Sequence, residues 1–234
     1  MEDMTTVQLA DLGPITQLRA GQLPRRLLQL YVGLWLYGVS LALMVRGHIG
    51  LAPWDVLHSG AIRHIPITLG QAVVLFSFVV LVLWIPLKEK PGLGTISNAL
   101  VIGVAADVTL GMFAAPDNMV ARVALMASGI LLCALATALY IGAQLGRGPR
   151  DGLMTGLARR TGLSIRLVRT ALEVTVVLLG LLLGGTLGLG TVVFALTIGP
   201  ITQWLLPIFL IDLGEATPQA EVGDNPEPHP DLLR

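Results

Sequence analysis

Long stretches without a charged residue restrict the fold of this chain more than any other feature. Residues 27–45, 64–87 and 123–146 contain no Asp, Glu, Lys or Arg, and residues 174–211 continue without one for 38 positions. A transmembrane helix needs about 20 mostly apolar residues. The last stretch is therefore long enough for two spans, and the glycine-rich residues 184–188 are the expected turn between them.

The composition supports the same class. Hydrophobic residues make up 54% of the chain and charged residues 13%, against about 25% charged in ordinary soluble domains. High hydrophobicity excludes a disordered chain. The balance of 15 basic and 15 acidic residues excludes a strongly basic nucleic-acid binder. A single cysteine, Cys133, excludes an intramolecular disulfide and a cysteine metal cage. We therefore predict an all-α polytopic protein whose partner is the lipid bilayer, with no cofactor.

We predict six transmembrane helices, at residues 28–46, 69–87, 94–114, 122–146, 165–184 and 190–211. Residues 1–27 form a cytoplasmic N-terminal segment that lacks the basic start of a cleavable signal peptide. Residues 212–234 are acidic and contain four prolines, which is typical of a disordered tail.

The basic residues predict how these spans are oriented. With the N-terminus inside, the spans leave Arg46, Arg63 and Arg122 outside and the other twelve of the 15 basic residues inside. Cytoplasmic loops carry the excess of Lys and Arg in membrane proteins. We therefore expect a multi-pass protein of the cell membrane with both termini in the cytoplasm.

The chain also repeats itself at a spacing of 96 residues. Residues 50–63 match residues 146–159, and residues 92–95 match residues 188–191, with Gly, Pro, Asp, Thr and Arg in register. The halves, residues 28–116 and 122–211, each hold three predicted spans. An odd number of spans makes the second half enter from the opposite side, so we predict two inverted repeats, an architecture frequent among secondary transporters.

Each repeat contains one segment too short to cross the membrane. Residues 53–64 would form a helix of about 18 Å, whereas the hydrocarbon core of a bilayer is about 30 Å thick. We expect this segment and its counterpart to be re-entrant or interfacial helices.

Four short motifs follow one another in the first repeat, and together they carry a resemblance to a known family. They are Gly50-x-x-Pro53-Trp54-Asp55-Val56-Leu57, Thr68-x-Gly70-Gln71, Lys90-Pro91-Gly92-Leu93-Gly94-Thr95 and Ile102-Gly103-x-x-x-Asp107. In this order they resemble the bacterial YczE-like membrane proteins, grouped with the YitT and YyaS proteins, over residues 28–212. The resemblance implies a bacterial inner-membrane protein with a suspected transport role, and it supplies no established binding residue.

Pro53 and Asp55, with their repeat counterparts Pro149 and Asp151, allow two interpretations. Proline suits the first turn of a helix, and an acidic residue just after it can simply cap that turn. Alternatively, the short helices point their N-termini at a substrate or ion within the membrane. Trp54 and His58 belong to the same candidate site. Asp55 and His58 are three residues apart, but no further ligand pattern accompanies them, so we predict no metal.

Three further polar residues fall within predicted spans. Asp107 and its counterpart Gln203 occupy matched positions, where they either face a polar cavity or join two helices by a hydrogen bond. A protonatable Asp107 would also suit proton coupling. Glu173 lies four residues after Arg169, which favours a helical ion pair. Thr68 and Gln71 read as a capping box, and Thr95 and Thr191 as helix N-caps.

Enzyme motifs are absent from the sequence, so we expect no catalytic residues. The leading hypothesis is a small-molecule secondary transporter that works by alternating access. It predicts a polar cavity lined by both repeats. The alternative is an accessory or regulatory membrane protein that transports nothing, and either could form a homo-oligomer.

Overall fold

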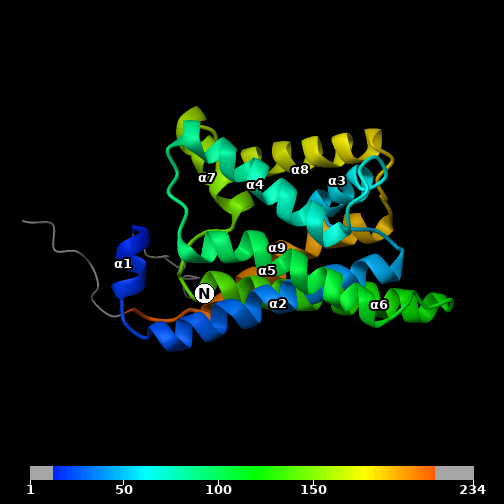
Figure 1. Ribbon diagram of the computed structural model, residues 1–234, viewed down its shortest axis with the longest axis horizontal. Coiled ribbons are helices and arrows are strands. Elements are labelled where there is room, and N and C mark those ends of the chain that lie inside the picture. The colour runs from blue at the N-terminus through cyan, green and yellow to red at the C-terminus, as the bar shows by residue number, and fades with distance from the viewer. Residues whose placement is uncertain (1–12, 214–234) are drawn as a thin grey trace, which may run out of the picture.

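The computed structural model describes residues 13–213, and within them the chain is helical, without strands (Figure 1). The predicted disordered tail from residue 214 onward, and residues 1–12 of the N-terminal segment, lie outside this range. The helices in chain order are α1 (Pro14–Arg19), α2 (Leu23–Gly47), α3 (Pro53–Ala61), α4 (Leu69–Leu87), α5 (Leu93–Met112), α6 (Met119–Gly142), α7 (Pro149–Thr161), α8 (Ile165–Leu182) and α9 (Leu189–Phe209).

Within residues 13–213, five helices are long and apolar enough to cross a membrane: α2, α4, α5, α6 and α9. The prediction for residues 69–87 coincides with α4. Helix α8 differs because Arg166, Arg169 and Glu173 occupy its first half. The chain is thus a multi-pass helical membrane protein.

The helices form two layers, with α2, α5, α6 and α9 in one and α3, α4, α7 and α8 in the other (Figure 1). Helices α2, α5 and α8 begin at the left-hand end of Figure 1, where α4, α6 and α9 finish. The short helices lie at opposite ends, α7 at the left and α3 at the right. Each short helix packs on a helix of the other half of the chain: α3 on α8, and α7 on α4.

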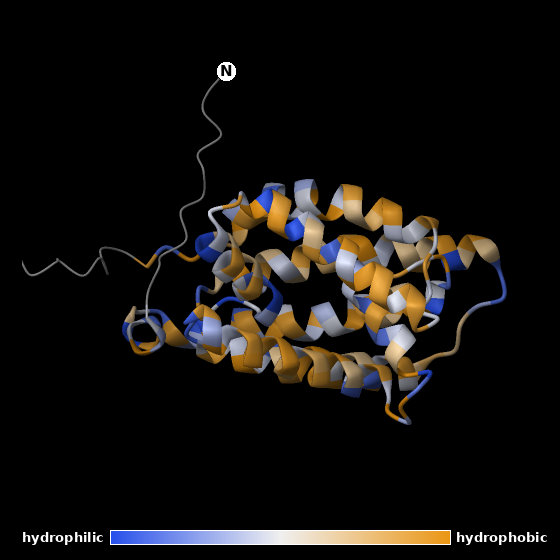
Figure 2. Cartoon of the chain, turned by 90° about the horizontal axis from the view of Figure 1, so that it is seen from above, coloured by the Kyte–Doolittle hydropathy of each residue, from blue (hydrophilic) through white to orange (hydrophobic). Residues whose placement is uncertain are grey.

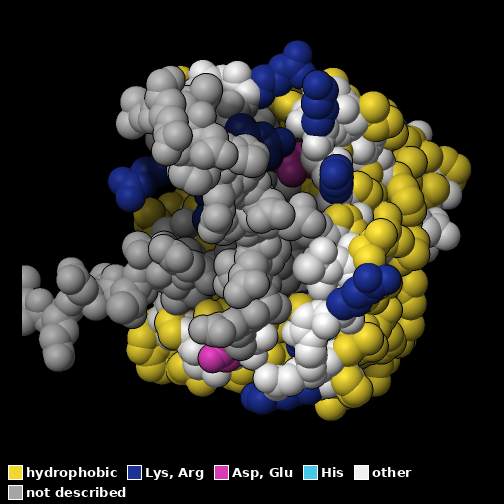
Figure 3. All heavy atoms as spheres, turned by 90° about the vertical axis from the view of Figure 1, so that its left-hand side faces the viewer, with side chains coloured by type: hydrophobic (Ala, Val, Ile, Leu, Met, Phe, Trp, Pro, Cys, Tyr) yellow, Lys and Arg dark blue, Asp and Glu magenta, His cyan; other side chains and the backbone are white. Residues whose placement is uncertain are grey.

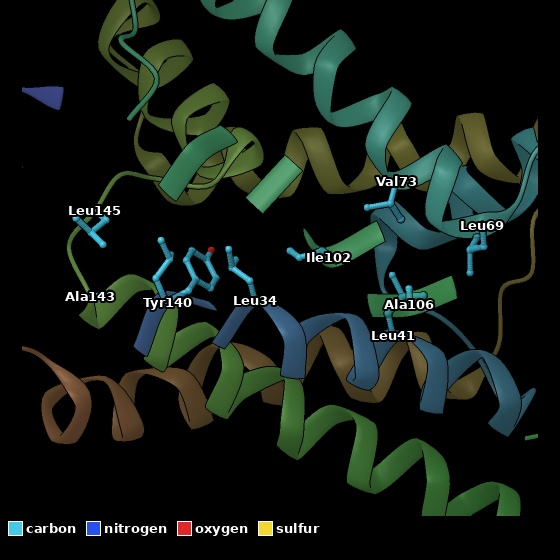
Figure 4. Close-up of a cluster of buried hydrophobic side chains, with 10 residues drawn as sticks. Leu34, Leu41, Leu69, Val73, Ile102, Ala106, Tyr140, Ala143 and Leu145 are labelled. Carbon is cyan, nitrogen blue, oxygen red and sulfur yellow. The ribbon is translucent and has the colours of Figure 1, made fainter. Parts of the chain in front are cut away.

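The layers meet tightly where α4 lies along α5. Leu34 and Leu41 of α2 pack with Ile102 of α5 and Val73 of α4 in one buried cluster (Figure 4). Gly103 makes this closeness possible, because a Cβ there would lie 2.4 Å from the carbonyl oxygen of Gly70. Helix α8, by contrast, is not packed along α9 and is supported by α3 and α7.

Matching backbone hydrogen bonds connect the two halves. The N–H of Gly94 donates to Leu145 O at 2.7 Å, and the N–H of Gly190, 96 residues later, donates to Ile49 O at 3.1 Å. Thr95 and Thr191 are not N-caps as predicted, because Gly92 and Gly188 hold those positions. The Thr95 hydroxyl instead accepts from the Gly92 N–H and donates to Arg147 O at 2.7 Å. The capping box of Thr68 and Gln71 is confirmed.

Hydrophobic residues dominate the long helices (Figure 2), and many large ones are exposed, including Ile85, Leu182 and Leu196. Basic side chains gather at the end where α2 begins (Figure 3). We call this the arginine-rich end, and the helix boundaries place there Arg25, Lys88, Lys90, Arg147, Arg159, Arg160 and Arg166. The opposite end has Arg46, Arg63 and Arg122.

Candidate functional site

Helices α3 and α7 start in the same way, with a glycine in an unusual conformation followed by proline in the first turn. Gly50 has φ +154° and Gly146, its counterpart, has φ +125°. L-residues rarely adopt these angles, so glycine is required at both positions where the chain turns into a short helix. Pro53 and Pro149 then occupy the first turn, where a missing N–H costs no hydrogen bond.

Asp55, the acidic residue in the first turn of α3, is buried, and α3 has no side-chain capping hydrogen bond. Its Oδ1 is 3.0 Å from His58 Nδ1 and 3.7 Å from an Arg150 nitrogen, and both Asp55 and His58 are 1% exposed. Burial lowers the pKa of the His58 imidazole below its ordinary value, although the hydrogen bond to Asp55 opposes the shift. Asp55 is thus held between an imidazole and a guanidinium from the other half of the chain.

Arg150 joins the two short helices. It belongs to α7, yet its guanidinium carbon lies 5.0 Å from the centre of the Trp54 ring in α3, a cation–π contact. Its contact with Asp55 is an ion pair, but the 3.7 Å between nitrogen and oxygen is too long for a hydrogen bond. Within residues 13–213 its guanidinium therefore retains its capacity to donate hydrogen bonds.

The second acidic residue, Asp151, accepts a hydrogen bond from the Tyr140 hydroxyl at 2.7 Å. Pro149, two residues earlier, accepts from the Trp84 indole at 2.9 Å. That bond and the close contact of Trp84 with Gly152 hold α7 against α4. The two acidic residues, which match in the repeat, thus have different partners.

A cavity of about 220 Å³ opens between the layers on the side where α8 and α9 are apart. Its lining comes from both halves of the chain: Pro53 and Trp54 from α3, Arg150 and Asp151 from α7, and residues of α2, α6, α8 and α9. The Thr202 hydroxyl in this lining is buried and lacks a hydrogen-bond partner among the described residues. Arg169 and Leu206 extend the lining toward the arginine-rich end.

A second cavity, of about 50 Å³, lies on the α4–α5 side. Tyr37, Tyr140, Arg150 and Asp151 line both cavities. The smaller cavity has five further lining residues, and each has its counterpart 96 positions away in the lining of the larger one. The pairs are Val73 with Arg169, Ser77 with Glu173, Asn98 with Phe194, Ile102 with Ile198, and Gly148 with Ala52.

The remaining predicted residues divide between the cavity and a helix junction. Gln203 and Glu173 line the larger cavity, and Glu173 accepts a hydrogen bond from Arg169 at 2.8 Å. Asp107 of α5 instead contacts the start of α4. Its carboxylate accepts hydrogen bonds from the Thr68 hydroxyl and, at 2.8 Å, from the Gly70 N–H. Asp107 therefore lines neither cavity, whereas Asp151 lines both.

Sequence reasoning missed Tyr37, Tyr140, Arg150 and Arg169 as lining residues. Arg150 could have been found, because it lies beside Asp151 and is the repeat counterpart of Trp54. The tyrosines gave no local pattern, since only packing brings them to the short helices. Within residues 13–213 no three His, Cys, Asp or Glu side chains gather into a group that could hold a metal ion.

Comparison with known proteins then places the chain. A family of unknown function, DUF6198, matches residues 24–207, which include every residue that lines the two cavities. The chain belongs to this family. The resemblance to YczE-like proteins inferred from the motifs is thereby confirmed.

Three relatives match this chain over about three quarters of its length or more. An uncharacterized protein of Haemophilus influenzae is 42% identical over 76% of this chain and 82% of its own length. The uncharacterized membrane protein YczE of Bacillus subtilis is 28% identical over 85% of this chain and 94% of its own length. The uncharacterized protein YyaS of the same species is 24% identical over 76% of this chain and 90% of its own length. No solved structure matches the chain.

Proposed function

We propose that this protein is a small-molecule secondary transporter in which two inverted repeats alternate access to a central site. The observation that carries the proposal is the pair of unequal cavities with matched linings. Residues 96 positions apart surround about 220 Å³ on one side and about 50 Å³ on the other. Equivalent sequence positions therefore line a large and a small cavity in the same molecule, as expected for one state of a symmetric two-state device.

The helix packing supports this interpretation. On the closed side α4 lies along α5, and Asp107 fastens the start of α4 through Thr68 and Gly70. On the open side α8 is apart from α9, and Gln203, the counterpart of Asp107, lines the cavity. Exchanging the two arrangements would close α8 on α9 and open the α4–α5 side.

The charge distribution supports an orientation for this state. If the arginine-rich end faces the cytoplasm, as the excess of basic residues favours, the larger cavity extends toward the cytoplasm and the Asp107 junction closes the outer side. The protein then spans the cell membrane six times, with α8 as the fifth span, and both repeats contribute to the site.

Cysteine accessibility tests alternation without knowledge of the substrate. In a Cys133→Ala background, Ile102→Cys and Ile198→Cys place one thiol in each matched position. In oriented vesicles a membrane-impermeant methanethiosulfonate should modify position 198 from the cytoplasmic side and position 102 from the outside. Ile130→Cys is the control that should stay unmodified, because Ile130 is as buried as Ile102 and Ile198 but lines neither cavity.

Two outcomes contradict the proposal. If position 102 never reacts from either side, the α4–α5 side does not open, which favours the accessory or regulatory role. If both positions react from both sides, the path is continuous and the protein is a channel.

A further inference from the structure

The four residues that line both cavities are the ones a substrate would contact in either state. Two of them, Arg150 and Asp151, are charged and consecutive in α7, yet they form no ion pair with each other. Opposite charges that face one cavity and do not pair with each other can both contact one ligand that carries the two complementary charges. This inference rests on the proposed function and concerns which ligand chemistry the site accepts.

Arg150 offers donors for an anionic group. A guanidinium has five N–H donors in a fork that suits a carboxylate. In the described part of the chain its contacts are the ion pair with Asp55 at 3.7 Å and the Trp54 ring at 5.0 Å, neither of which is a hydrogen bond. The side chain is 22% exposed and faces the cavity, so a ligand carboxylate can reach it.

Asp151 offers acceptors for a cationic group. Its Oδ2 accepts from Tyr140, whereas its Oδ1 has no hydrogen-bond partner within residues 13–213. An ionised carboxylate can accept about four hydrogen bonds. Asp151 thus has free acceptor capacity in the same cavity as Arg150, whose donors make no hydrogen bond among the described residues, and an ammonium group fits Asp151.

The rest of the lining limits the net charge and size of the ligand. Arg169 and Glu173 pair with each other at 2.8 Å, and the buried Asp55 pairs with Arg150, so the charged groups around the cavity have no excess of positive charge. A ligand with net negative charge would be left uncompensated at membrane depth, which is costly. Trp54, Phe194 and Ile198 give the cavity an apolar wall. Since a 150 Å³ cavity holds benzene, about 220 Å³ suits roughly nine non-hydrogen atoms.

We infer that the substrate is a small zwitterion whose carboxylate binds Arg150 and whose ammonium binds Asp151. An α-amino acid with an aliphatic side chain is the simplest molecule of this class and size. Its apolar part would contact Trp54 and Phe194, and Tyr37 and Tyr140 would remain beside it as access changes from one side to the other.

Three matched probes test the inference by calorimetry on the full-length protein in lipid nanodiscs. L-Leucine carries both charged groups, 4-methylpentanoate lacks the ammonium and 3-methylbutylamine lacks the carboxylate. We expect leucine to bind at least about tenfold more tightly than either analogue, because each analogue leaves Arg150 or Asp151 without its partner group on the ligand. Equal affinity for leucine and 4-methylpentanoate would overturn the inference in favour of an anion site.

Two variants assign the contacts. Arg150→Gln should weaken leucine binding about tenfold or more and leave 3-methylbutylamine binding unchanged. Asp151→Asn should weaken leucine and leave 4-methylpentanoate unchanged. This selectivity separates lost contacts from misfolding, which would affect all probes. Arg166→Gln is the control that should behave as wild type, because Arg166 is exposed and lines neither cavity.

Failure of the inference and failure of the proposed function can be told apart. If leucine does not bind but positions 102 and 198 still react from opposite sides, alternation stands and the zwitterion assignment is wrong. If leucine binds as described but position 102 never opens, the binding site stands and the protein does not transport by alternating access.

Discussion

His58 is a titratable side chain without contact to solvent, and it faces a charged neighbourhood. Its ring is 1% exposed, its Nδ1 lies 3.0 Å from Asp55, and Phe76 packs against it at 5.4 Å between ring centres. Arg150, which contacts the same Asp55 oxygen, disfavours a second positive charge there. The imidazole is therefore held neutral, and the folded protein resists protonating it.

This neutrality predicts how stability depends on pH. The folded-state pKa of His58 is lowered, whereas the unfolded chain titrates near 6.5. Below about pH 6.5 the unfolded chain therefore binds more protons, and stability is lost as the pH falls, by up to about 1.4 kcal/mol per pH unit. The thermal midpoint of the purified protein should be flat above pH 7 and fall below 6.5, and less steeply in His58→Gln. An equally steep fall in the variant would assign the effect to other groups.

The sequence predicted part of the site at this scale. Pro53, Asp55, Pro149 and Asp151 could be found because glycine and proline mark helix starts by local geometry. The sequence alone could not predict that Asp55 is buried against His58 while Asp151 faces a cavity. Those environments depend on Arg150 crossing to Trp54 from the other half of the chain, a contact that no local pattern encodes.

Helix packing explains why matched glycines have different surroundings. A Cβ on Gly103 of α5 would lie 2.4 Å from the Gly70 carbonyl oxygen in α4, whereas a Cβ on Gly199 of α9 would meet nothing within 4 Å. The two positions are 96 residues apart and both lie inside helices. Their surroundings differ because α4 packs along α5, whereas α8 lies apart from α9.

Matched substitutions should therefore have opposite consequences. Gly103→Ala should lower the thermal midpoint, because overpacking a close contact costs about 1–3 kcal/mol. Gly199→Ala should be neutral or stabilising, since alanine is the better helix former by up to about 1 kcal/mol. The comparison is made by thermal unfolding in one detergent. Equal destabilisation by both changes would contradict the asymmetry.

Element boundaries were largely predictable because they follow from uncharged stretches and their ends. The predicted spans at 94–114 and 190–211 differ from α5 and α9 by no more than two residues at either end. The gap between α8 and α9 was not predictable. Matched segments of the two halves have similar sequences, so the repeat alone cannot say which pair of helices packs closely and which lies apart.

At the scale of the whole molecule, α8 decides how the chain crosses the membrane. The five long apolar helices leave the chain with an odd number of crossings unless α8 is also a span. Its 18 residues measure about 27 Å, close to the hydrocarbon thickness. Its charged residues do not all face lipid, because Arg169 and Glu173 pair in the cavity lining. The loop after α8 reaches the end of the molecule opposite the arginine-rich end, where the Thr186 N–H bonds the Ser59 hydroxyl at 3.0 Å.

Single cysteines on either side of α8 test the crossing in whole cells of the Cys133→Ala variant. Thr161 and Thr186 flank the helix and are both exposed. If α8 spans the membrane with the arginine-rich end inside, an impermeant maleimide should label Thr186→Cys in intact cells and Thr161→Cys only after permeabilisation. Asp117→Cys, between α5 and α6, should label like Thr186→Cys, and Lys88→Cys, after α4, like Thr161→Cys. Labelling of positions 161 and 186 from the same side would show that α8 does not cross. The second half would then hold two spans instead of three, and the two halves could not be inverted copies, because inversion requires an odd number of crossings in each.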